Sequence, residues 1–336
     1  MLILTNCLTD VVDEGCLKVA NSLIRRLKDI DENICVLSYD REHSLSDKHL
    51  NLNKFFLSNE LRKSISKADD DVLYAPFPAR TLPTALRIFM LSLYCRKNLR
   101  VLMVQKENYN FLAKLLLKLS KAQLVVLSKE SFDFYNEFVN KKRIMYLKTG
   151  VDTKRFVPVD EEKSKELKHK YGFDKDTPVV LHVGHLKYGR NVQKLLGVDS
   201  SRQVVLVCST LTENEQDIKL RQELSLKDNI CIMDGYIENI EEIYQLCDVY
   251  LFPTVESGNC IDVPLSCMEA ASCNKPVVCT AYGEMKELLC ENGFYPLDDV
   301  SEKKINEKID KALSEKSEPR KAVLAYDWDN AVKSLI

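Results

Sequence analysis

The chain has 336 residues, 45% of them hydrophobic, which is enough for two ordinary domains with separate cores. The formal net charge is only −2, but residues 1–150 carry 24 Lys and Arg against 17 Asp and Glu, while the remainder carries 24 against 33. No apolar run approaches the roughly 20 residues of a membrane span, so we expect a soluble or at most peripheral protein.

The basic first half favours an anionic partner, such as a membrane surface or a phosphate-bearing acceptor. The alternative is scattered charge that serves solubility alone. Nucleic acid is not an expected partner, because the most charged run, residues 160–170, mixes both signs.

Twelve cysteines occur without a C-x2-C pair and without a signal peptide, which points to a reducing compartment. Cys35, Cys208, Cys231 and Cys279 lie in apolar strand-like segments, so we expect buried thiols and no zinc site. We predict a cytoplasmic protein, with peripheral contact at the inner face of a membrane through the first half as a further hypothesis.

Residues 1–150 alternate apolar strands with helical segments, a pattern typical of a doubly wound parallel sheet. The strand at 1–5 leads through a loop containing Gly15 into a helix at 16–27. A loop after the first strand lies at the carboxyl edge of a parallel sheet, where open α/β folds bind ligands. This loop is therefore a candidate ligand site, and a glycine that merely starts the helix is the alternative reading of Gly15.

An amphipathic helix is predicted over residues 109–121, because its apolar residues and its lysines recur at helical spacing. We expect its apolar residues to face the core and its lysines to face water. The alternative is a basic helix that lies on an anionic membrane.

In the second half, a buried strand at 178–184 is followed by a loop with three basic side chains, His185, Lys187 and Arg190. Arg190 is charged at any working pH and can donate to two phosphate oxygens at once. His185 contributes charge only when protonated and otherwise a single neutral hydrogen bond.

Residues 249–280 predict a strand at 249–253, a loop that contains Glu256 and Gly258, a helix at 265–272 and a strand at 277–280. Free backbone N–H groups and the positive end of the helix dipole favour an anion at the start of this helix. A ligand with phosphates is therefore expected here, close to Glu269 in the middle of the helix.

These segments resemble the signature of the retaining nucleotide-sugar glycosyltransferases of family GT4 (glycosyltransferase group 1). The matching runs are Leu251-Phe252-Pro253-Thr254, Met268-Glu269-Ala270-Ala271, Lys275-Pro276-Val277-Val278, the basic loop at 185–190 and the interdomain run Thr149-Gly150-Val151-Asp152. The resemblance implies the α/β GT-B fold, two Rossmann-like doubly wound parallel-sheet domains facing across a cleft. It implies an acceptor-binding domain at 1–150, a donor-binding domain at 151–315 and a helix crossing back at 316–336.

The resemblance also implies roles for the site residues. Glu269 would hold the ribose hydroxyls, while His185 and Arg190 would grip the donor diphosphate with added charge from Lys187. Ile237, which follows a Gly-Tyr pair, would contact the base. Glu256, Gly258 and Gly15 complete the candidate donor contacts.

The family's first acidic residue, eight positions before Glu269, is replaced by Ile261. Asp262 and Glu256 are the candidates for its role. Asp262 would share a helix face with Glu269 if the helix began that early, since seven residues make about two turns. An N-cap or first-turn role for Asp262 is the alternative.

The implied reaction moves a hexose from a nucleoside-diphosphate sugar of UDP or GDP type to a hydroxyl of a glycan or lipid-linked acceptor. Anomeric configuration would be retained, no metal or separate cofactor would be needed, and the pathway would be glycan, glycolipid or polysaccharide synthesis. Arg190, Asp262 and Glu269 are the expected catalytic residues. A non-catalytic GT-B scaffold subunit and a GT-B nucleotide-sugar epimerase are the alternatives.

Overall fold

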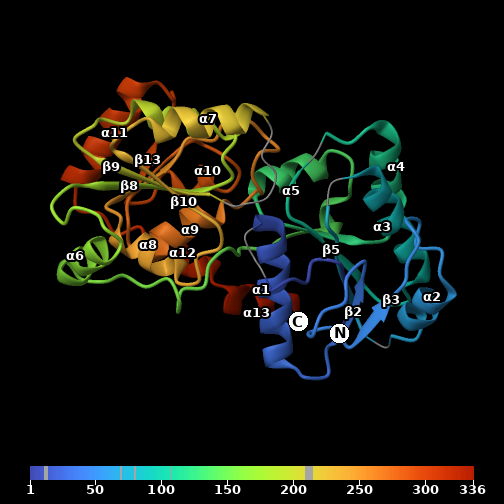
Figure 1. Ribbon diagram of the computed structural model, residues 1–336. Helices are drawn as coiled ribbons and strands as arrows, with labels where there is room; N and C mark the ends of the chain where they lie inside the picture. The colour runs from blue at the N-terminus through green and yellow to red at the C-terminus, as the bar shows by residue number, and fades with distance from the viewer. Residues whose placement is uncertain (11–13, 69, 79–80, 107, 209–214) are drawn as a thin grey trace. The chain divides into compact units, whose positions relative to one another are not determined.

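The computed structural model describes residues 1–10, 14–68, 70–78, 81–106, 108–208 and 215–336 (Figure 1). The chain forms two compact units. The first comprises Met1–Thr149, Ile261–Val263 and Trp328–Ile336, and the second comprises Gly150–Cys260 and Pro264–Asp327.

The first unit contains a seven-stranded parallel sheet in the order β3-β2-β1-β4-β5-β6-β7. Its strands are β1 (Leu2–Thr5), β2 (Cys35–Tyr39), β3 (Lys48–Leu50), β4 (Val72–Ala75), β5 (Leu99–Met103), β6 (Gln123–Val126) and β7 (Ile144–Tyr146). The edge strand β3 was not predicted from the sequence. Three residues with one buried apolar side chain are too short to show a strand pattern in the sequence.

The helices of the first unit are α1 (Gly15–Ile30), α2 (Asn59–Ser66), α3 (Leu82–Tyr94), α4 (Phe111–Leu119), α5 (Lys129–Asn136) and α13 (Trp328–Leu335). Buried residues of α2 to α5 share one core with alternate residues of the strands, whereas α13 packs against α1. The expected burial of α4 was wrong in part. Only Ala113 and Leu117 of this helix are buried, while Phe111, Leu112 and Leu119 are exposed.

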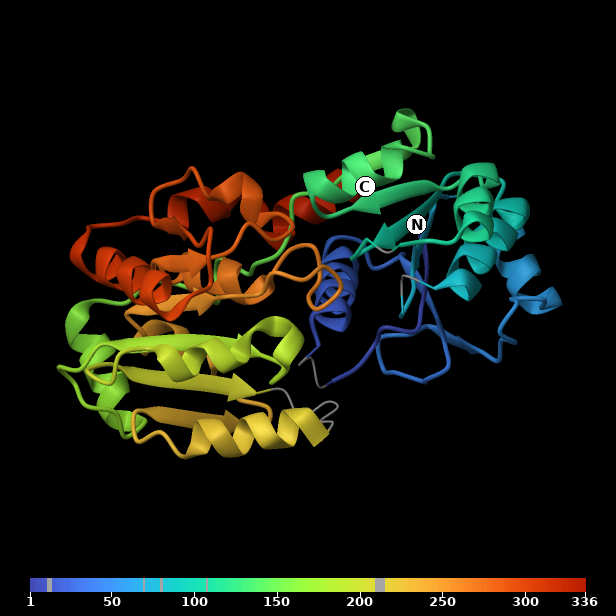
Figure 2. The same cartoon turned by 90° about the horizontal axis from the view of Figure 1, so that it is seen from above.

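The second unit contains a six-stranded parallel sheet in the order β10-β9-β8-β11-β12-β13. Figure 2 shows strands of this sheet as arrows that point the same way. The strands are β8 (Val179–Gly184), β9 (Gln203–Cys208), β10 (Ile230–Asp234), β11 (Val249–Phe252), β12 (Val277–Cys279) and β13 (Phe294–Pro296). The helices are α6 (Glu161–Lys170), α7 (Glu215–Ser225), α8 (Ile240–Leu246), α9 (Leu265–Ser272), α10 (Met285–Leu288), α11 (Glu302–Ser314) and α12 (Arg320–Val323).

The return to the first unit begins at Trp328, later than the expected 316. The intervening α12 packs against α9 of the second unit. Arg320 fixes it there, because its guanidinium donates to the carbonyl oxygens of Phe156 at 2.7 Å and Thr153 at 2.9 Å. These contacts hold residues 316–327 in the second unit.

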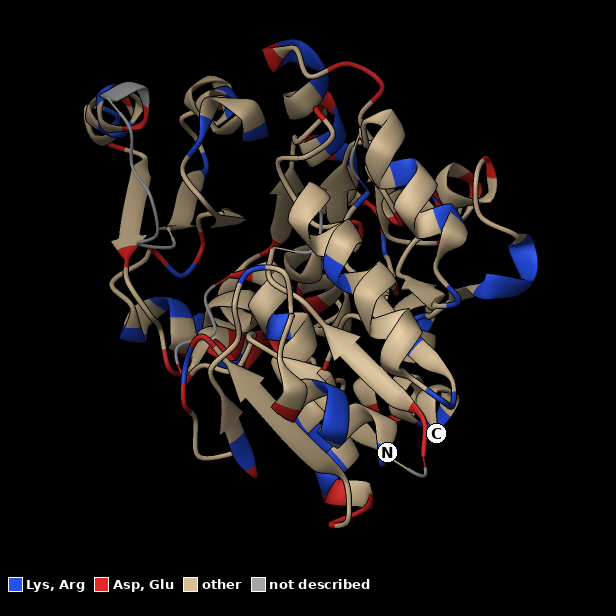
Figure 3. Cartoon of the chain, turned by 90° about the vertical axis from the view of Figure 1, so that its right-hand side faces the viewer, with Lys and Arg blue, Asp and Glu red and all other residues tan. Residues whose placement is uncertain are grey.

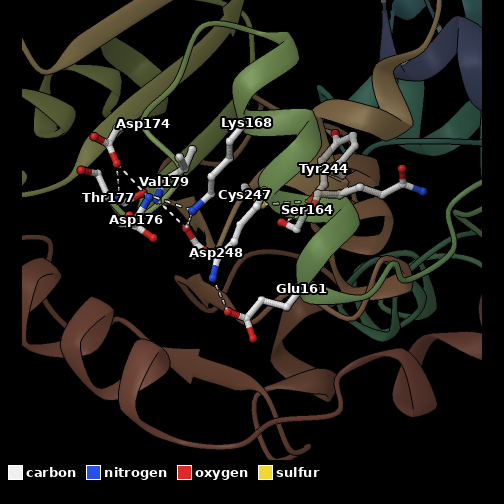
Figure 4. Close-up of polar contacts among 12 residues, drawn as sticks. Glu161, Ser164, Lys168, Asp174, Asp176, Thr177, Val179, Tyr244, Cys247 and Asp248 are labelled. Carbon is white, nitrogen blue, oxygen red and sulfur yellow. Dashed lines mark hydrogen bonds and ion pairs between the residues drawn. The ribbon is translucent and has the colours of Figure 1, made fainter.

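An ion pair between the buried Lys168 and the half-buried Asp248 joins α6 to the start of the second sheet (Figure 4). The Lys168 ammonium donates to the Asp248 carboxylate at 2.7 Å and to the Thr177 carbonyl oxygen at 3.1 Å. Asp248 also accepts the Val179 backbone N–H at 2.7 Å. The pair thus aligns β8 with the residue that precedes β11, and both the Lys168 ammonium and Oδ2 of Asp248 are hydrogen-bonded.

The cysteine expectation holds for Cys208 and Cys279, which are buried, and burial raises the pKa of the Cys279 thiol to about 12. Cys35 is half-buried and Cys231 is exposed. The predicted burial of Cys231 was wrong, because its strand, β10, is at the edge of the sheet and has a neighbouring strand on one side only.

Candidate functional site

The loop after β8 is tied to the loop after β11, its neighbour in the sheet. Asn191 adopts the left-handed conformation with φ of 58°, which asparagine tolerates better than most residues. Its side-chain amide donates to the Pro253 carbonyl oxygen at 2.9 Å. The basic loop and the glycine-containing loop predicted from the sequence therefore meet at the carboxyl edge of the second sheet, where parallel α/β sheets bind ligands.

Arg190 is fixed in this loop from two sides. Its Nε donates to the Asn259 carbonyl oxygen at 2.7 Å, and its own carbonyl oxygen accepts from the Thr254 hydroxyl at 3.3 Å. Its Nη1 lies over Gly184, where a Cβ atom would stand only 2.7 Å away. Among the residues that the structure describes, Arg190 forms no ion pair. The site thus holds a permanent, oriented positive charge.

His185 lies beside this charge and is itself neutral at pH 7. Burial and the nearby cations Arg190 and Lys187 lower the pKa of His185 to about 4. Its Nδ1 is buried and has no hydrogen-bond partner in the described part of the chain. The imidazole can therefore give a ligand one hydrogen bond but no charge, which leaves Arg190 and Lys187 as the cations of the loop.

His182 is a residue that the sequence reasoning missed. It is buried in β8, its Nδ1 lies 2.8 Å from the Leu251 carbonyl oxygen, and its ring stacks on Tyr250. A carbonyl oxygen only accepts, so Nδ1 carries the proton and Nε2 is a bare acceptor without a partner among the described residues. The available signal was a single polar residue within an otherwise apolar strand.

Glu269 lies in the middle of α9, as expected, and is buried. Tyr244 of α8 lies near this carboxylate. Burial is the first cause that raises the pKa of the Tyr244 hydroxyl, and the negative charge of Glu269 is the second. Pro264 occupies the N-cap position of α9 and makes no capping hydrogen bond. The helix start is thus free of the side-chain oxygen that usually occupies such N–H groups.

Both expected placements of Asp262 were wrong, because α9 begins only at Leu265 and its N-cap is Pro264. Proline favours an extended conformation in the residue before it, so the helix cannot extend back to Asp262. Asp262 belongs instead to the first unit. Its carboxylate accepts from the Ser131 hydroxyl and from the Lys106 backbone N–H, the latter at 3.3 Å.

Gly15 is the first residue of α1, and a Cβ there would stand 3.3 Å from the Ile261 side chain. The N-terminus of α1 already holds a negative group. The Glu14 carboxylate accepts the backbone N–H of Cys16 at 2.7 Å and of Leu17 at 3.1 Å. This arrangement disfavours a phosphate at the same helix end.

The remaining candidates lie in the second unit. Glu256 is exposed, and its carboxylate accepts from the Asn259 amide at 3.3 Å. Gly258 has φ of 92°, a conformation that a residue with a side chain rarely adopts. Ile237 is half-buried between β10 and α8. Asn259 was missed by the sequence reasoning because it acts through its backbone carbonyl, which any residue carries.

No group of three or more His, Cys, Asp or Glu side chains in the described ranges could hold a metal ion. Within the same ranges, no helix is long and apolar enough to cross a membrane.

The model of the family described as "Glycosyl transferases group 1" matches residues 163–326. Among solved structures, Alr3699/HepE of Anabaena in complex with UDP matches with a TM-score of 0.76 and 14% identity, covering 99% of this chain and 97% of that chain. A glycosyltransferase from Rickettsia africae matches with a TM-score of 0.72 and 14% identity, covering 99% and 91%. The N-terminal domain of Candida albicans trehalose-6-phosphate phosphatase matches with a TM-score of 0.74 and 11% identity, covering 99% and 95%.

A comparison with curated protein sequences finds no match. The structural matches span almost the whole chain and confirm the predicted fold class. The family match supports glycosyl transfer as the kind of reaction. The chain therefore has the GT-B fold, and its residues 163–326 match the family of group 1 glycosyl transferases.

Proposed function

We propose that the protein is a retaining, metal-independent hexosyltransferase of the GT4 type, which uses a nucleoside-diphosphate sugar as donor and a hydroxyl of a glycan or lipid-linked acceptor. The proposal rests on the site around Arg190 in the second unit.

The observation that carries the proposal is a fixed cation without an ion-pair partner in the described residues. Arg190 is held by the Asn259 carbonyl oxygen and lies against Gly184, so little movement is needed to bind an anion. Its two Nη groups form no hydrogen bond to the described residues, and their planar arrangement matches the geometry of phosphate oxygens. Lys187 adds a second charge in the same loop, and a diphosphate is the anion that fits two neighbouring cations.

Cleavage of the anomeric bond places negative charge on the departing diphosphate. Groups that are already oriented toward that charge stabilise the transition state at no cost of reorganisation, and each contributes about 10²–10³-fold in turnover. In this chain Arg190 and Lys187 supply positive charge and His185 one hydrogen bond. Glu269 would accept hydrogen bonds from the ribose hydroxyls. No protein nucleophile is part of the scheme, because the diphosphate itself would take the proton of the acceptor.

The solved relatives support the choice of donor. Alr3699/HepE of Anabaena has been solved with UDP, with UDP and glucose, and with UDP-glucose. We therefore place UDP-sugars before GDP-sugars as donors to test. A cytoplasmic location and a role in glycan or polysaccharide synthesis are part of the same proposal.

The binding test compares UDP, GDP and ADP by thermal shift and calorimetry, with Arg190→Ala as the variant and Arg221→Ala as the control. Arg221 lies in the same unit but is paired with Asp234 at 2.7 Å on the surface. A ligand that binds only the folded protein raises the free energy of unfolding by RT ln(1 + L/Kd), where L is the free ligand concentration, and the melting temperature rises with it. We expect one nucleotide to bind wild type and Arg221→Ala equally, and Arg190→Ala at least about tenfold more weakly.

The activity test uses radiolabelled donor with and without a panel of glycan and lipid acceptors. We expect product only with an acceptor, and a loss of about 10²-fold in turnover for Arg190→Ala. Conversion of the donor sugar without acceptor would favour an epimerase. Absence of nucleotide binding by a folded protein would favour the scaffold alternative and refute the transferase.

A further inference from the structure

The surface of the first unit around α3 and α4 is apolar where a solvated helix would be polar. In α4 the buried residues are Ala113 and Leu117, and the opposite side of the helix carries Phe111, Leu112, Leu115 and Leu119 at helical spacing. Phe111 is 82% exposed, Leu119 59% and Leu112 51%. This helix has two apolar faces, and only one of them is used by the core.

The neighbouring α3 shows the same arrangement. It packs against α4, and it buries Ala85, Ile88 and Leu91. The outward side carries Leu82, Leu86, Met90 and Leu93, of which Leu93 is 60% exposed. Apolar surface exposed on two helices that pack together is uncommon on a soluble monomer and is typical of an interaction site.

The charged residues of α3 and α4 themselves have one sign. Neither α3 nor α4 contains an Asp or Glu, and their charged residues are Arg87, Lys114 and Lys118. Figure 3 shows blue Lys and Arg segments next to long tan stretches of helix on the side that faces the viewer.

Exposed basic residues gather where the helices end. Both helices lead into adjacent parallel strands, β5 and β6, so their C-terminal ends lie at the same sheet edge. The turn before β7 is tied to this edge, because Arg143 donates to the Leu117 and Lys118 carbonyl oxygens at 3.3 Å. The exposed basic residues that surround the helix ends are Arg96, Lys97, Lys118, Lys121, Lys141 and Lys142.

Two carboxylates at this edge are neutralised. Asp71 pairs with Arg100 at 3.1 Å, and Asp70 pairs with the N-terminal amino group at 3.2 Å. They therefore leave the excess of positive charge around α3 and α4 largely in place.

From these observations we propose that the outward faces of α3 and α4 dock on a lipid bilayer that contains anionic phospholipids. Phe111, Leu112, Leu119 and Leu93 would enter the boundary between headgroups and acyl chains, and the lysines at the helix ends would contact lipid phosphates. An apolar helix face flanked by lysines is the pattern of helices that lie in a membrane interface. Long lysine side chains can reach the headgroups while their methylenes cover apolar surface. The proposal concerns a surface of the first unit and does not depend on the donor reaction.

The test is sedimentation of the full chain with vesicles of phosphatidylcholine alone or mixed with phosphatidylglycerol. We expect strong binding to the anionic vesicles, weaker binding to neutral ones, and loss of binding as salt is raised, because salt screens exposed charges. Phe111→Ser should weaken binding to anionic vesicles about tenfold, since it removes one large apolar contact. Lys121→Ala should weaken it about fivefold on anionic vesicles alone.

Leu226→Ser is the matched control, because Leu226 is 83% exposed and lies in the second unit. Its binding should equal that of wild type, and all three variants should unfold at the wild-type temperature, since each replaced side chain is exposed. The proposal is overturned if wild type does not sediment with anionic vesicles, or if Leu226→Ser weakens binding as much as Phe111→Ser does. Self-association without vesicles that Phe111→Ser abolishes, with no vesicle binding, would assign the face to a second copy of the chain instead.

Discussion

Substitution of Gly184 by alanine is the sharpest way to test the role of Arg190, because it moves the charge without removing it. The new Cβ would stand 2.7 Å from Nη1 of Arg190 and 3.6 Å from Nε2 of His182. Ordinary contact begins near 3.4 Å, so the guanidinium must retreat by roughly 0.7 Å. The displaced atom is the end of a flexible side chain, and we expect a change in stability below about 1 kcal/mol.

The effect on binding should be far larger than the effect on stability. A hydrogen bond to a charged group contributes about 1.5–3 kcal/mol, which is roughly 10- to 150-fold in the dissociation constant. A displaced guanidinium keeps part of its attraction, so we expect about tenfold weaker binding of the nucleoside diphosphate by Gly184→Ala. A misplacement on the order of 1 Å can also cost about 10²-fold in turnover.

The assay is a double-mutant cycle measured by calorimetry with Gly184→Ala, Arg190→Ala and the double variant. If Gly184→Ala acts only through Arg190, it should change nothing in the Arg190→Ala background, and the coupling should equal its whole effect. Wild-type affinity in Gly184→Ala would refute the reasoning. So would an equal loss of affinity in both backgrounds, since the glycine would then act directly on the ligand.

Three further predictions concern the second unit. Asp248→Ala should lower the free energy of unfolding by about 3 kcal/mol in a denaturant titration, because the buried Lys168 ammonium loses its carboxylate partner. Adding Lys168→Met to this variant should recover part of the loss. An unchanged unfolding midpoint in Asp248→Ala would contradict the assignment. Burial lowers the pKa of His182 from 6.5 to about 4, so the unfolded chain binds more protons between these pH values, and the His182 contribution to stability should fall by about 3 kcal/mol as pH drops from 6.5 to 4. His182→Asn should lose less stability than wild type by about that amount, because His185 keeps its own pH-dependent contribution. Glu269→Gln should weaken the binding of a ribonucleoside diphosphate by at least about fivefold. It should weaken the binding of the 2′-deoxy analogue by a smaller factor. Equal losses of affinity for the two ligands would argue against a ribose contact.

Much of the fold could be read from local patterns. The strands are short runs of buried apolar residues separated by helical segments, and this alternation alone predicts parallel α/β sheets. The helix at 265–272 was placed at its observed bounds because Pro264 and the Asn274–Pro276 segment mark its ends. The basic loop at 185–190 could also be recognised, since its spacing of cations is a local property.

What could not be read locally was the partner of each group. Asp262 looked like a helix residue, yet its carboxylate bonds to Ser131 and Lys106, which are distant in the sequence. The backbone carbonyl of Asn259 that orients Arg190 leaves no mark in the sequence, because every residue has one.

The sequence by itself determined the alternation of strands and helices, the loops that carry the cations and the position of Glu269, because these follow from hydrophobic period and turn chemistry. Only the tertiary structure decided that His185 is neutral, that Arg190 rests on Gly184 and that α4 leaves an apolar face uncovered. The physical reason is that protonation, orientation and exposure depend on neighbours brought together by folding, and amphipathic periodicity cannot tell which of two apolar faces the core will bury.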